Sequence, residues 1–210
     1  MTLRLLLADD HTLVRQGLRA LLEREQFEVL AEASDGLEAV QCAEKLHPDA
    51  AILDLGMPGL NGIDASHEIQ RVSPRTRVIL LTMHPDERYV LAALRSGVRG
   101  YVLKTRAAAD LVQAIREVCS GHMYLSPGIA HTVVEAVLSK TDSPEDPLTP
   151  RERQVLQLVA EGKTTKEVAV ILGISAKTAE SHRTRIMQKL DIHETAGLVR
   201  YAIRSGVIQA

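Results

Sequence analysis

Five polar side chains stand where short apolar runs of the sequence stop. They are Asp9, Asp10, Asp54, Thr82 and Lys104. Apolar runs bounded by turn residues are typical of buried strands in a parallel sheet. In open α/β sheets the functional groups lie beyond the carboxyl ends of such strands. We therefore expect these five side chains to gather at one rim of a sheet.

The types of these residues indicate phosphoryl transfer. Carboxylates at one rim repel one another, and a hard divalent cation relieves that repulsion; oxygen ligands completed by water suit Mg²⁺. The hydroxyl of Thr82 and the ammonium group of Lys104 would stabilise charge that develops on a phosphoryl group. Asp54, which a loop of Gly, Pro and Asn follows at once, is then the candidate nucleophile and would form an aspartyl phosphate. Taken alone, Asp54 can also be a carboxylate that caps a turn.

The elements that must position these residues follow from the alternation of apolar and polar segments. The expected strands are 3–8, 27–33, 49–54, 78–81 and 100–103, and the expected helices are 11–26, 37–46, 62–72, 86–96 and 107–120. Strands that alternate with helices predict a five-stranded, doubly wound parallel α/β sheet over about the first 121 residues.

Composition is that of an ordinary soluble globular protein, with 45% hydrophobic and 25% charged residues. No apolar run approaches the roughly 20 residues of a membrane span, and we expect neither a signal peptide nor a membrane partner. Cys42 and Cys119 lie inside helix-like patterns without metal-binding spacing. We expect both to be reduced residues of a cytoplasmic protein.

Charge divides the chain into two parts. Residues 148–210 carry 10 Lys/Arg and 6 Asp/Glu, whereas the residues before them carry 15 and 21. Residues 140–147 contain two prolines and no apolar residue, which is typical of a linker. An apolar helical pattern over 127–139 predicts an extra helix before it. The predicted boundaries are 1–122 for the first domain, 123–146 for the linker and 147–210 for the second domain.

The second domain is predicted to be entirely helical. Its expected helices are 150–161, 165–172, 175–190 and about 194–205. Gly173 and Ile174 form a turn between the second and third that is short enough for a helix-turn-helix. The helix 175–190 has one face without apolar residues, formed by Lys177, Ser181, Thr184 and Gln188. Such a face is either solvated or, in a basic helix-turn-helix domain, the surface that reads the DNA major groove.

The first part resembles the flavodoxin-like receiver domain of bacterial response regulators. The resemblance rests on Asp9-Asp10, on Asp54 with Met57-Pro58 and Gly62, and on Thr82 and Lys104. It implies that Asp54 accepts phosphate from a sensor histidine kinase, and that Asp10, Asp54 and the Gly56 carbonyl bind Mg²⁺ while Asp9 acts through water. It also implies that Thr82 and Lys104 contact the phosphoryl oxygens. Tyr101 matches the aromatic residue whose rotation reports phosphorylation.

The last 63 residues or so resemble the LuxR/NarL-type DNA-binding domain. The matching motifs lie at 148–153, 161–163, 166–169, 177–183 and 186–190, and two departures are Thr165 in place of Asn and Ala179 in place of Val. In that arrangement Glu180, Ser181 and Thr184 would face base edges. The expected phosphate contacts are Lys177, Thr178, Arg183, Arg185 and Lys189.

These patterns predict a transcription regulator that is switched by phosphorylation of Asp54. On activation it is expected to dimerise and to bind DNA half-sites. We expect a phosphoacceptor rather than an enzyme. One alternative is a phosphatase with Asp54 as its nucleophile, although the sequence has no substrate-cap domain and no phosphate-binding Gly-rich loop. The other alternative is a regulator whose C-terminal helices bind a protein instead of DNA.

Overall fold

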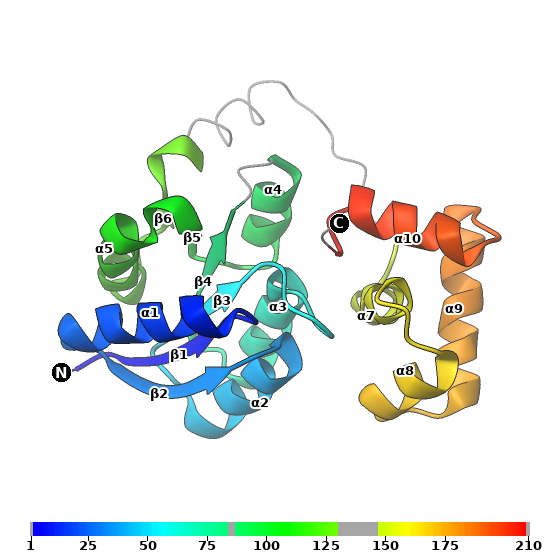
Figure 1. The fold of residues 1–210 in the computed structure, drawn as a ribbon, viewed down its shortest axis with the longest axis horizontal. Helices are drawn as coiled ribbons and strands as arrows, with labels where there is room; N and C mark the ends of the chain where they lie inside the picture. The colour runs from blue at the N-terminus through cyan, green and yellow to red at the C-terminus, as the bar shows by residue number, and fades with distance from the viewer. Residues whose placement is uncertain (1, 84–86, 130–146, 209–210) are drawn as a thin grey trace. The chain divides into compact units, whose positions relative to one another are not determined.

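A computed structural model describes residues 2–83, 87–129 and 147–208 of the chain, drawn in Figure 1. The chain divides into two compact units, residues 1–141 and 142–210. The domain boundaries predicted from the sequence stay a prediction, because most of the segment between the two domains lies outside the described residues. Across the described residues, no helix is long and apolar enough to cross a membrane.

The first unit is built on a parallel sheet (Figure 1). Its strands are β1 (Arg4–Ala8), β2 (Glu28–Ala33), β3 (Ala50–Asp54), β4 (Arg77–Thr82), β5 (Gly100–Leu103) and β6 (Tyr124–Leu125). Their order in the sheet is β2-β1-β3-β4-β5-β6. The predicted α/β class is therefore confirmed, with one strand more than expected.

Helices cover both faces of this sheet, because the side chains of successive strand residues point to opposite faces. The helices are α1 (Thr12–Arg24), α2 (Gly36–Leu46), α3 (Gly62–Val72), α4 (Glu87–Arg95) and α5 (Ala107–Cys119), with a short 3₁₀ turn, η1 (Lys104–Arg106), before α5. One buried cluster joins α1 and α5 to the sheet through residues such as Leu22 and Ile115. The other joins α2, α3 and α4 and contains Tyr101.

The strand β6 was missed by the sequence analysis. It has only two residues, too few for an alternating pattern to be visible. The amide of Tyr124 donates to the carbonyl of Arg99 at 2.9 Å, and the amide of Ser126 donates to the carbonyl of Tyr101 at 2.9 Å, which adds it to the edge of β5. Residues 127–129 are helical, and the rest of the predicted extra helix lies outside the described residues.

The second unit is helical in its described part, as predicted. It contains α7 (Pro150–Ala160), α8 (Thr165–Ile171), α9 (Ala176–Leu190) and α10 (Thr195–Arg204). Side-chain caps at Thr149, Thr164 and Ser175 begin the first three helices. An apolar core from all four helices holds them together, with Ala179 and Ile186 as its buried residues from α9.

Candidate functional site

Strand register brings the candidate residues of the first unit to one rim of the sheet. Ala8 pairs with Leu53, so Asp9 and Asp54 end neighbouring strands. Asp54 pairs with Leu81, and Thr82 pairs with Leu103. Thr82 and Lys104 therefore follow at the same edge.

Lys104 joins two of the three carboxylates. Its Nζ lies 2.8 Å from Oδ2 of Asp9 and 2.9 Å from Oδ2 of Asp54. The side chain of Asp9 is fully buried and that of Asp54 is 6% exposed, so both ion pairs are shielded from water. Burial on its own is costly for these charges, and the two pairs offset that cost.

This environment shifts the protonation of both partners. Burial raises the pKa of the Asp54 carboxyl; Lys104 acts against that rise, and the charges of Asp9 and Asp10 add to it. Burial alone would lower the pKa of Lys104, but the hydrogen bonds and charges of Asp9 and Asp54 outweigh burial and raise it. Lys104 is thus a firmly charged ammonium group beside the candidate nucleophile.

The loop after β3 packs closely against Asp54. The amide of Gly62 donates to the carbonyl of Leu55 at 2.9 Å, and a Cβ atom at position 62 would collide with the carbonyl oxygen of Asp54. The side chain of Met57 is buried, and the side chain of Asn61 accepts a hydrogen bond from the amide of Asp64 to begin α3. Glycine is therefore required at position 62 because the backbone approaches the site there.

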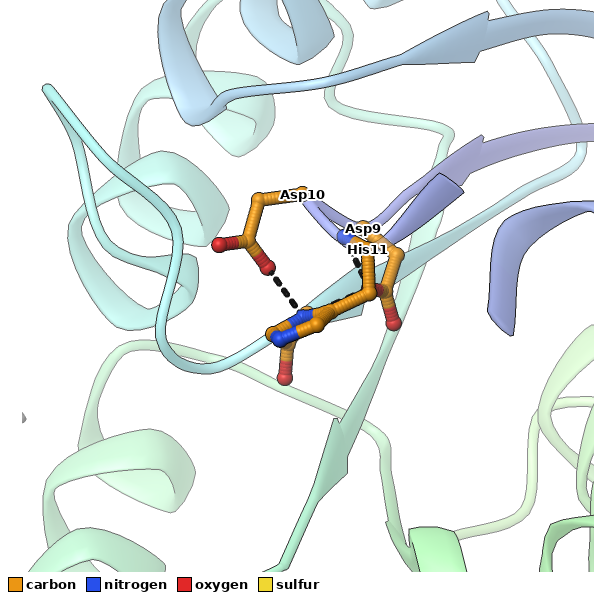
Figure 2. A group of neighbouring side chains, drawn as sticks. Asp9, Asp10 and His11 are labelled. Carbon is orange, nitrogen blue, oxygen red and sulfur yellow. Dashed lines mark hydrogen bonds and ion pairs between the residues drawn. The ribbon is translucent and has the colours of Figure 1, made fainter. Parts of the chain in front are cut away.

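His11 joins the carboxylates across the β1–α1 turn, which is residues 9–11 (Figure 2). Its Nδ1 lies 2.7 Å from Oδ1 of Asp10 and 3.5 Å from Oδ1 of Asp9. His11 is the N-cap residue of α1, at the start of the helix predicted over 11–26, and its ring lies among the acids. Its position directly after the acidic pair was the available signal for this placement.

The residues present fit a divalent cation. Ligand atoms of Asp9, Asp10, His11 and Asp54 all lie within 4.8 Å of one another. We call these four residues the acidic cluster. Three carboxylates with a partly exposed member, Asp10, match the oxygen-rich, partly hydrated shell that Mg²⁺ takes.

The other predicted members of the site lie in the loop after β3, on β4 and on β5. Gly56 lies in the loop after β3, and Thr82 is fully buried at the end of β4. Tyr101 is fully buried on the sheet face that α2, α3 and α4 cover. The functional roles assigned to these residues stay predictions.

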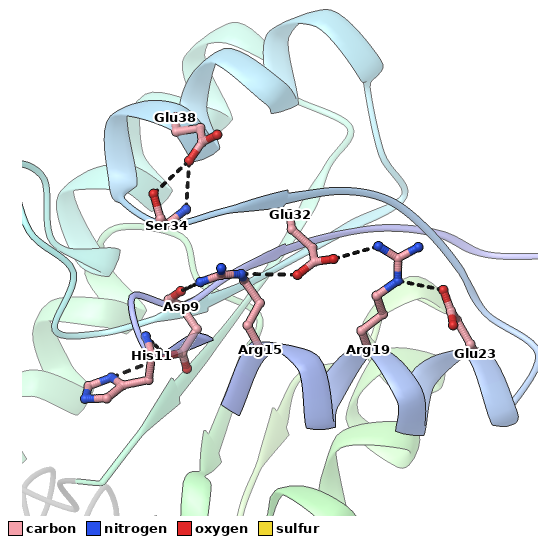
Figure 3. A network of polar contacts seen from close by, with 8 residues as sticks. All are labelled: Asp9, His11, Arg15, Arg19, Glu23, Glu32, Ser34 and Glu38. Atoms are coloured by element: carbon pink, nitrogen blue, oxygen red, sulfur yellow. Dashed lines mark hydrogen bonds and ion pairs between the residues drawn. The ribbon is translucent and has the colours of Figure 1, made fainter. Parts of the chain in front are cut away.

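A polar network behind the acidic cluster was missed by the sequence analysis (Figure 3). Arg15 donates through Nη1 to the carbonyl oxygen of Asp9 at 2.6 Å and through Nε to Glu32 at 3.1 Å. Arg19 donates to the other oxygen of Glu32 at 2.6 Å and to Glu23 at 2.8 Å. Glu32, one of two glutamates in the strand 28–33, was the sequence signal for this network.

The second unit carries the candidate DNA-reading surface on α9. Ala179 and Ile186 are buried, whereas Lys177, Ser181 and Thr184 on the opposite side are exposed. A shallow hollow of about 440 Å³ is bordered by Lys177, Glu180, Ser181, Thr184, Arg185 and Gln188. We call these six residues the polar face of α9.

Several predicted DNA contacts also have partners within this unit. Nζ of Lys189 lies 2.6 Å from Glu152 on α7, Arg183 donates to Thr195 at 2.8 Å, and the hydroxyl of Thr178 lies 2.8 Å from that of Ser175. Lys189 therefore links α9 to α7, so its predicted contact with a DNA phosphate would compete with this ion pair.

Thr165, one of the two residues that depart from the family pattern, contacts the polar face. Its hydroxyl donates to Oε2 of Glu180 at 3.0 Å. This contact at the start of α8 holds the side chain that is predicted to read a base.

Comparison with known proteins agrees with this geometry. The response regulator receiver domain matches residues 5–116, and the luxR family of bacterial regulatory proteins matches residues 146–202. The chain is 37% identical to transcriptional regulatory protein MctR of Rhizobium johnstonii over 207 residues, covering 98% of this chain and 95% of that protein. It is 39% identical to transcriptional regulatory protein LiaR of Bacillus subtilis over 209 residues, covering 98% and 99%.

Among solved structures, a similar one is RcsB from Salmonella enterica serovar Typhimurium, bound to promoter P1flhDC in the presence of the phosphomimetic BeF₃⁻. It is 30% identical with a TM-score of 0.63, and the match covers 99% of this chain and 100% of that one. The receiver match precedes the LuxR-type match within one chain. The chain belongs to the LuxR-type response regulators of two-component systems, with a receiver domain followed by a helix-turn-helix DNA-binding domain.

Proposed function

We propose that this response regulator is switched by Mg²⁺-dependent phosphorylation of Asp54, with a sensor histidine kinase as the donor. The observation that carries this proposal is the placement of a nearly buried Asp54 carboxylate against Lys104, inside the acidic cluster. A carboxylate held between a cation site and an ammonium group is suited to accept a phosphoryl group.

The proposed transfer forms one bond and breaks one. A carboxylate oxygen of Asp54 attacks phosphorus, the bond from phosphorus to the imidazole nitrogen of the donor breaks, and the electron pair leaves with the imidazole. Lys104 already contacts Asp54 at 2.9 Å and stabilises the charge that builds up on the phosphoryl oxygens. Thr82 supplies a hydroxyl at the same rim.

Asp10, Asp54 and the Gly56 carbonyl would hold the cation, and Asp9 would act through water. When bound, Mg²⁺ offsets the negative charge of the carboxylates and of the incoming phosphoryl group. Oxygen donors of this kind are the ligands it prefers. His11 is not needed for this role, because a hard cation gains little from an imidazole nitrogen.

The proposed output begins with Thr82 and Lys104 moving toward the phosphoryl group. Thr82 ends β4 and Lys104 follows β5, so both strands end at the modified residue. Tyr101 on β5 packs in the same buried cluster as α4, which makes the surface around α4 and β5 the one that changes. A dimer formed in this state would present two copies of α9 to half-sites about one DNA turn apart.

The polar face of α9 is the proposed DNA contact, with Glu180, Ser181 and Thr184 toward base edges. The solved RcsB complex with promoter DNA supports this assignment by likeness. We propose that the chain is a stoichiometric phosphoacceptor and not an enzyme that turns over small phosphates.

Replacement of Asp54 by Asn tests the phosphoacceptor. Acetyl phosphate with Mg²⁺ should label the wild-type chain with one phosphoryl group that hydroxylamine removes, and Asp54→Asn should abolish the label. Asp191→Asn, which changes an exposed carboxylate of the second unit, should label normally. Undiminished labelling of Asp54→Asn would exclude Asp54 as the acceptor, and rapid multiple turnover of phosphate esters would favour the phosphatase alternative.

A further inference from the structure

We propose that Arg15 is a positioning residue for the metal and phosphoryl chemistry at Asp54. It acts through the main chain of the β1–α1 turn, which carries Asp9 and Asp10. The inference rests on the proposed function, and it adds a residue that touches neither the cation nor the phosphoryl group.

The first observation is the contact of Arg15 with the turn itself. Its Nη1 donates to the carbonyl oxygen of Asp9 at 2.6 Å, and its side chain is only 16% exposed (Figure 3). The carbonyl of Asp9 is part of the peptide bond that joins Asp9 to Asp10, and both residues belong to the acidic cluster. A hydrogen bond from a charged donor at this atom therefore fixes the direction in which the chain leaves β1.

The second observation is that other contacts of the turn reach other atoms, whereas Arg15 holds the carbonyl of Asp9. The amide of Asp9 donates to the carbonyl of Ala33 at 3.2 Å, and the amide of His11 donates to Oδ1 of Asp9 at 2.9 Å. Lys104 fixes Oδ2 of Asp9. Because like charges in the cluster repel, a turn without the Arg15 bond can move Asp10 away from the cation position.

The third observation is that Glu32 on β2 keeps Arg15 in place. It accepts from Nε of Arg15 at 3.1 Å and from Arg19 at 2.6 Å. Hydrogen bonds from Arg19, the larger effect, and from Arg15 both lower the pKa of Glu32 below its ordinary value. An ordinary glutamate is already ionised at neutral pH, so Glu32 can aim Arg15 with or without Arg19. With its charge balanced by Glu32, Arg15 donates to a carbonyl and does not pair with the acids that must bind the cation.

The network also supplies a matched control. Arg15 and Arg19 both bind Glu32, but Arg19 is 46% exposed and its other partner is Glu23 on α1, far from the turn in sequence. Removing Arg19 therefore deletes an equal charge and a comparable ion pair without touching the turn. A positioning role predicts different results for the two arginines, whereas general stabilisation of α1 predicts similar ones.

The experiment measures cation affinity directly on the full chain. Mn²⁺ binding is followed by electron paramagnetic resonance, and the Mg²⁺ concentration for half-maximal labelling by acetyl phosphate is measured in parallel. Arg15→Ala should weaken Mn²⁺ binding and raise that Mg²⁺ concentration by about tenfold. Arg19→Ala should change either quantity by less than about twofold. Arg15→Lys, which keeps a donor for the carbonyl, should lie between Arg15→Ala and wild type.

Saturating Mg²⁺ separates positioning from folding. Arg15→Ala should then regain most of the wild-type labelling rate, and its thermal unfolding should resemble that of Arg19→Ala. Equal cation affinities for the two alanine variants would overturn the inference, as would a loss of labelling in Arg15→Ala that Mg²⁺ does not restore. Failure of the wild type itself to bind Mn²⁺ or to label at Asp54 would instead refute the proposed function.

Discussion

At the scale of single residues, position at a strand end decides which side chains can act together. Asp9, Asp54 and Lys104 were expected at one rim because parallel strands end on the same side, and they do meet there. Arg15 and Glu32 could not be foreseen in this way. Their contact depends on the pairing of β1 with β2 and on the rotation of α1, neither of which a single sequence displays.

Thr165 gives a prediction at this scale, because its hydroxyl holds the carboxylate of Glu180. Thr165→Val removes that donor and leaves the size of the side chain nearly unchanged. A glutamate carboxylate accepts a hydrogen bond from N4 of cytosine, so under the proposed function Glu180 would read a cytosine. Discrimination for cytosine at that position should then fall by about 1 kcal/mol, or about fivefold. Selection from randomised DNA followed by sequencing measures the preference.

Thr165→Ser is the control, because it keeps the hydroxyl and should keep the wild-type preference. Affinity for non-specific DNA should be the same for both variants, since no phosphate contact is lost. A uniform loss of affinity across all sequences would show that Thr165 does not act through a base reader.

At the scale of elements, the alternation of segments predicted most helix boundaries within a residue or two. The helix α7 was expected at 150–161 and spans Pro150–Ala160, after a capping box formed by Thr149 and Glu152. The link from α9 to α7 through Lys189 was not foreseen, because the helix pattern assigned Lys189 to DNA and cannot show which neighbour a flexible side chain reaches.

This link predicts a pH dependence of stability in the second unit. Burial alone would raise the pKa of Glu152, but hydrogen bonds from Lys189 and Thr149 outweigh it and lower that pKa below its ordinary value. A lowered folded-state pKa contributes stability above the unfolded-state pKa, and this contribution is lost as pH falls through the folded-state pKa. The free energy of unfolding of the second unit should therefore decline below about pH 5.

The variant Glu152→Gln isolates that contribution. At neutral pH it should lower the free energy of unfolding by about 1–2 kcal/mol, and the gap to wild type should close as pH falls. Urea denaturation followed by circular dichroism provides the measurement. Glu167→Gln is the matched control, since Glu167 completes a capping box of the same type at the exposed start of α8. This substitution should lower the free energy of unfolding by less. A gap that stays constant with pH would contradict an ionic contribution.

At the scale of the whole molecule, two features of the sequence predicted two domains of different chemistry. They are the charge distribution and the change from alternating strand and helix patterns to helix patterns alone. The first 147 residues are acidic and the last 63 are basic, and the contact pattern of the chain also separates into two units. The α/β and helical classes followed from the alternation of segments. No local sequence pattern predicts how phosphorylation of the first unit changes DNA binding by the second, so this effect has to be measured.

Beryllofluoride with Mg²⁺ should convert the wild-type chain to a dimer and raise its affinity for DNA by about tenfold or more. A complete shift from 1:99 to 99:1 would need about 5.5 kcal/mol of preference for the active state. Asp54→Asn should show neither effect. Analytical ultracentrifugation and fluorescence anisotropy with labelled DNA provide the two readouts.

Salt dependence distinguishes DNA binding from a protein output. DNA affinity of the activated chain should fall steeply with salt, and Lys177→Ala should reduce the slope of log K against log salt by about one. An activated chain without measurable DNA affinity would support the alternative in which the C-terminal helices bind a protein.

The ammonium group of Lys104 lies between two buried carboxylates and forms an ion pair with each of them. Because this ammonium group offsets the charge of the buried carboxylates, the receiver does not need a bound cation to remain folded. At low magnesium concentration the receiver would then stay folded but would not be phosphorylated, and phosphorylation would resume when magnesium is restored.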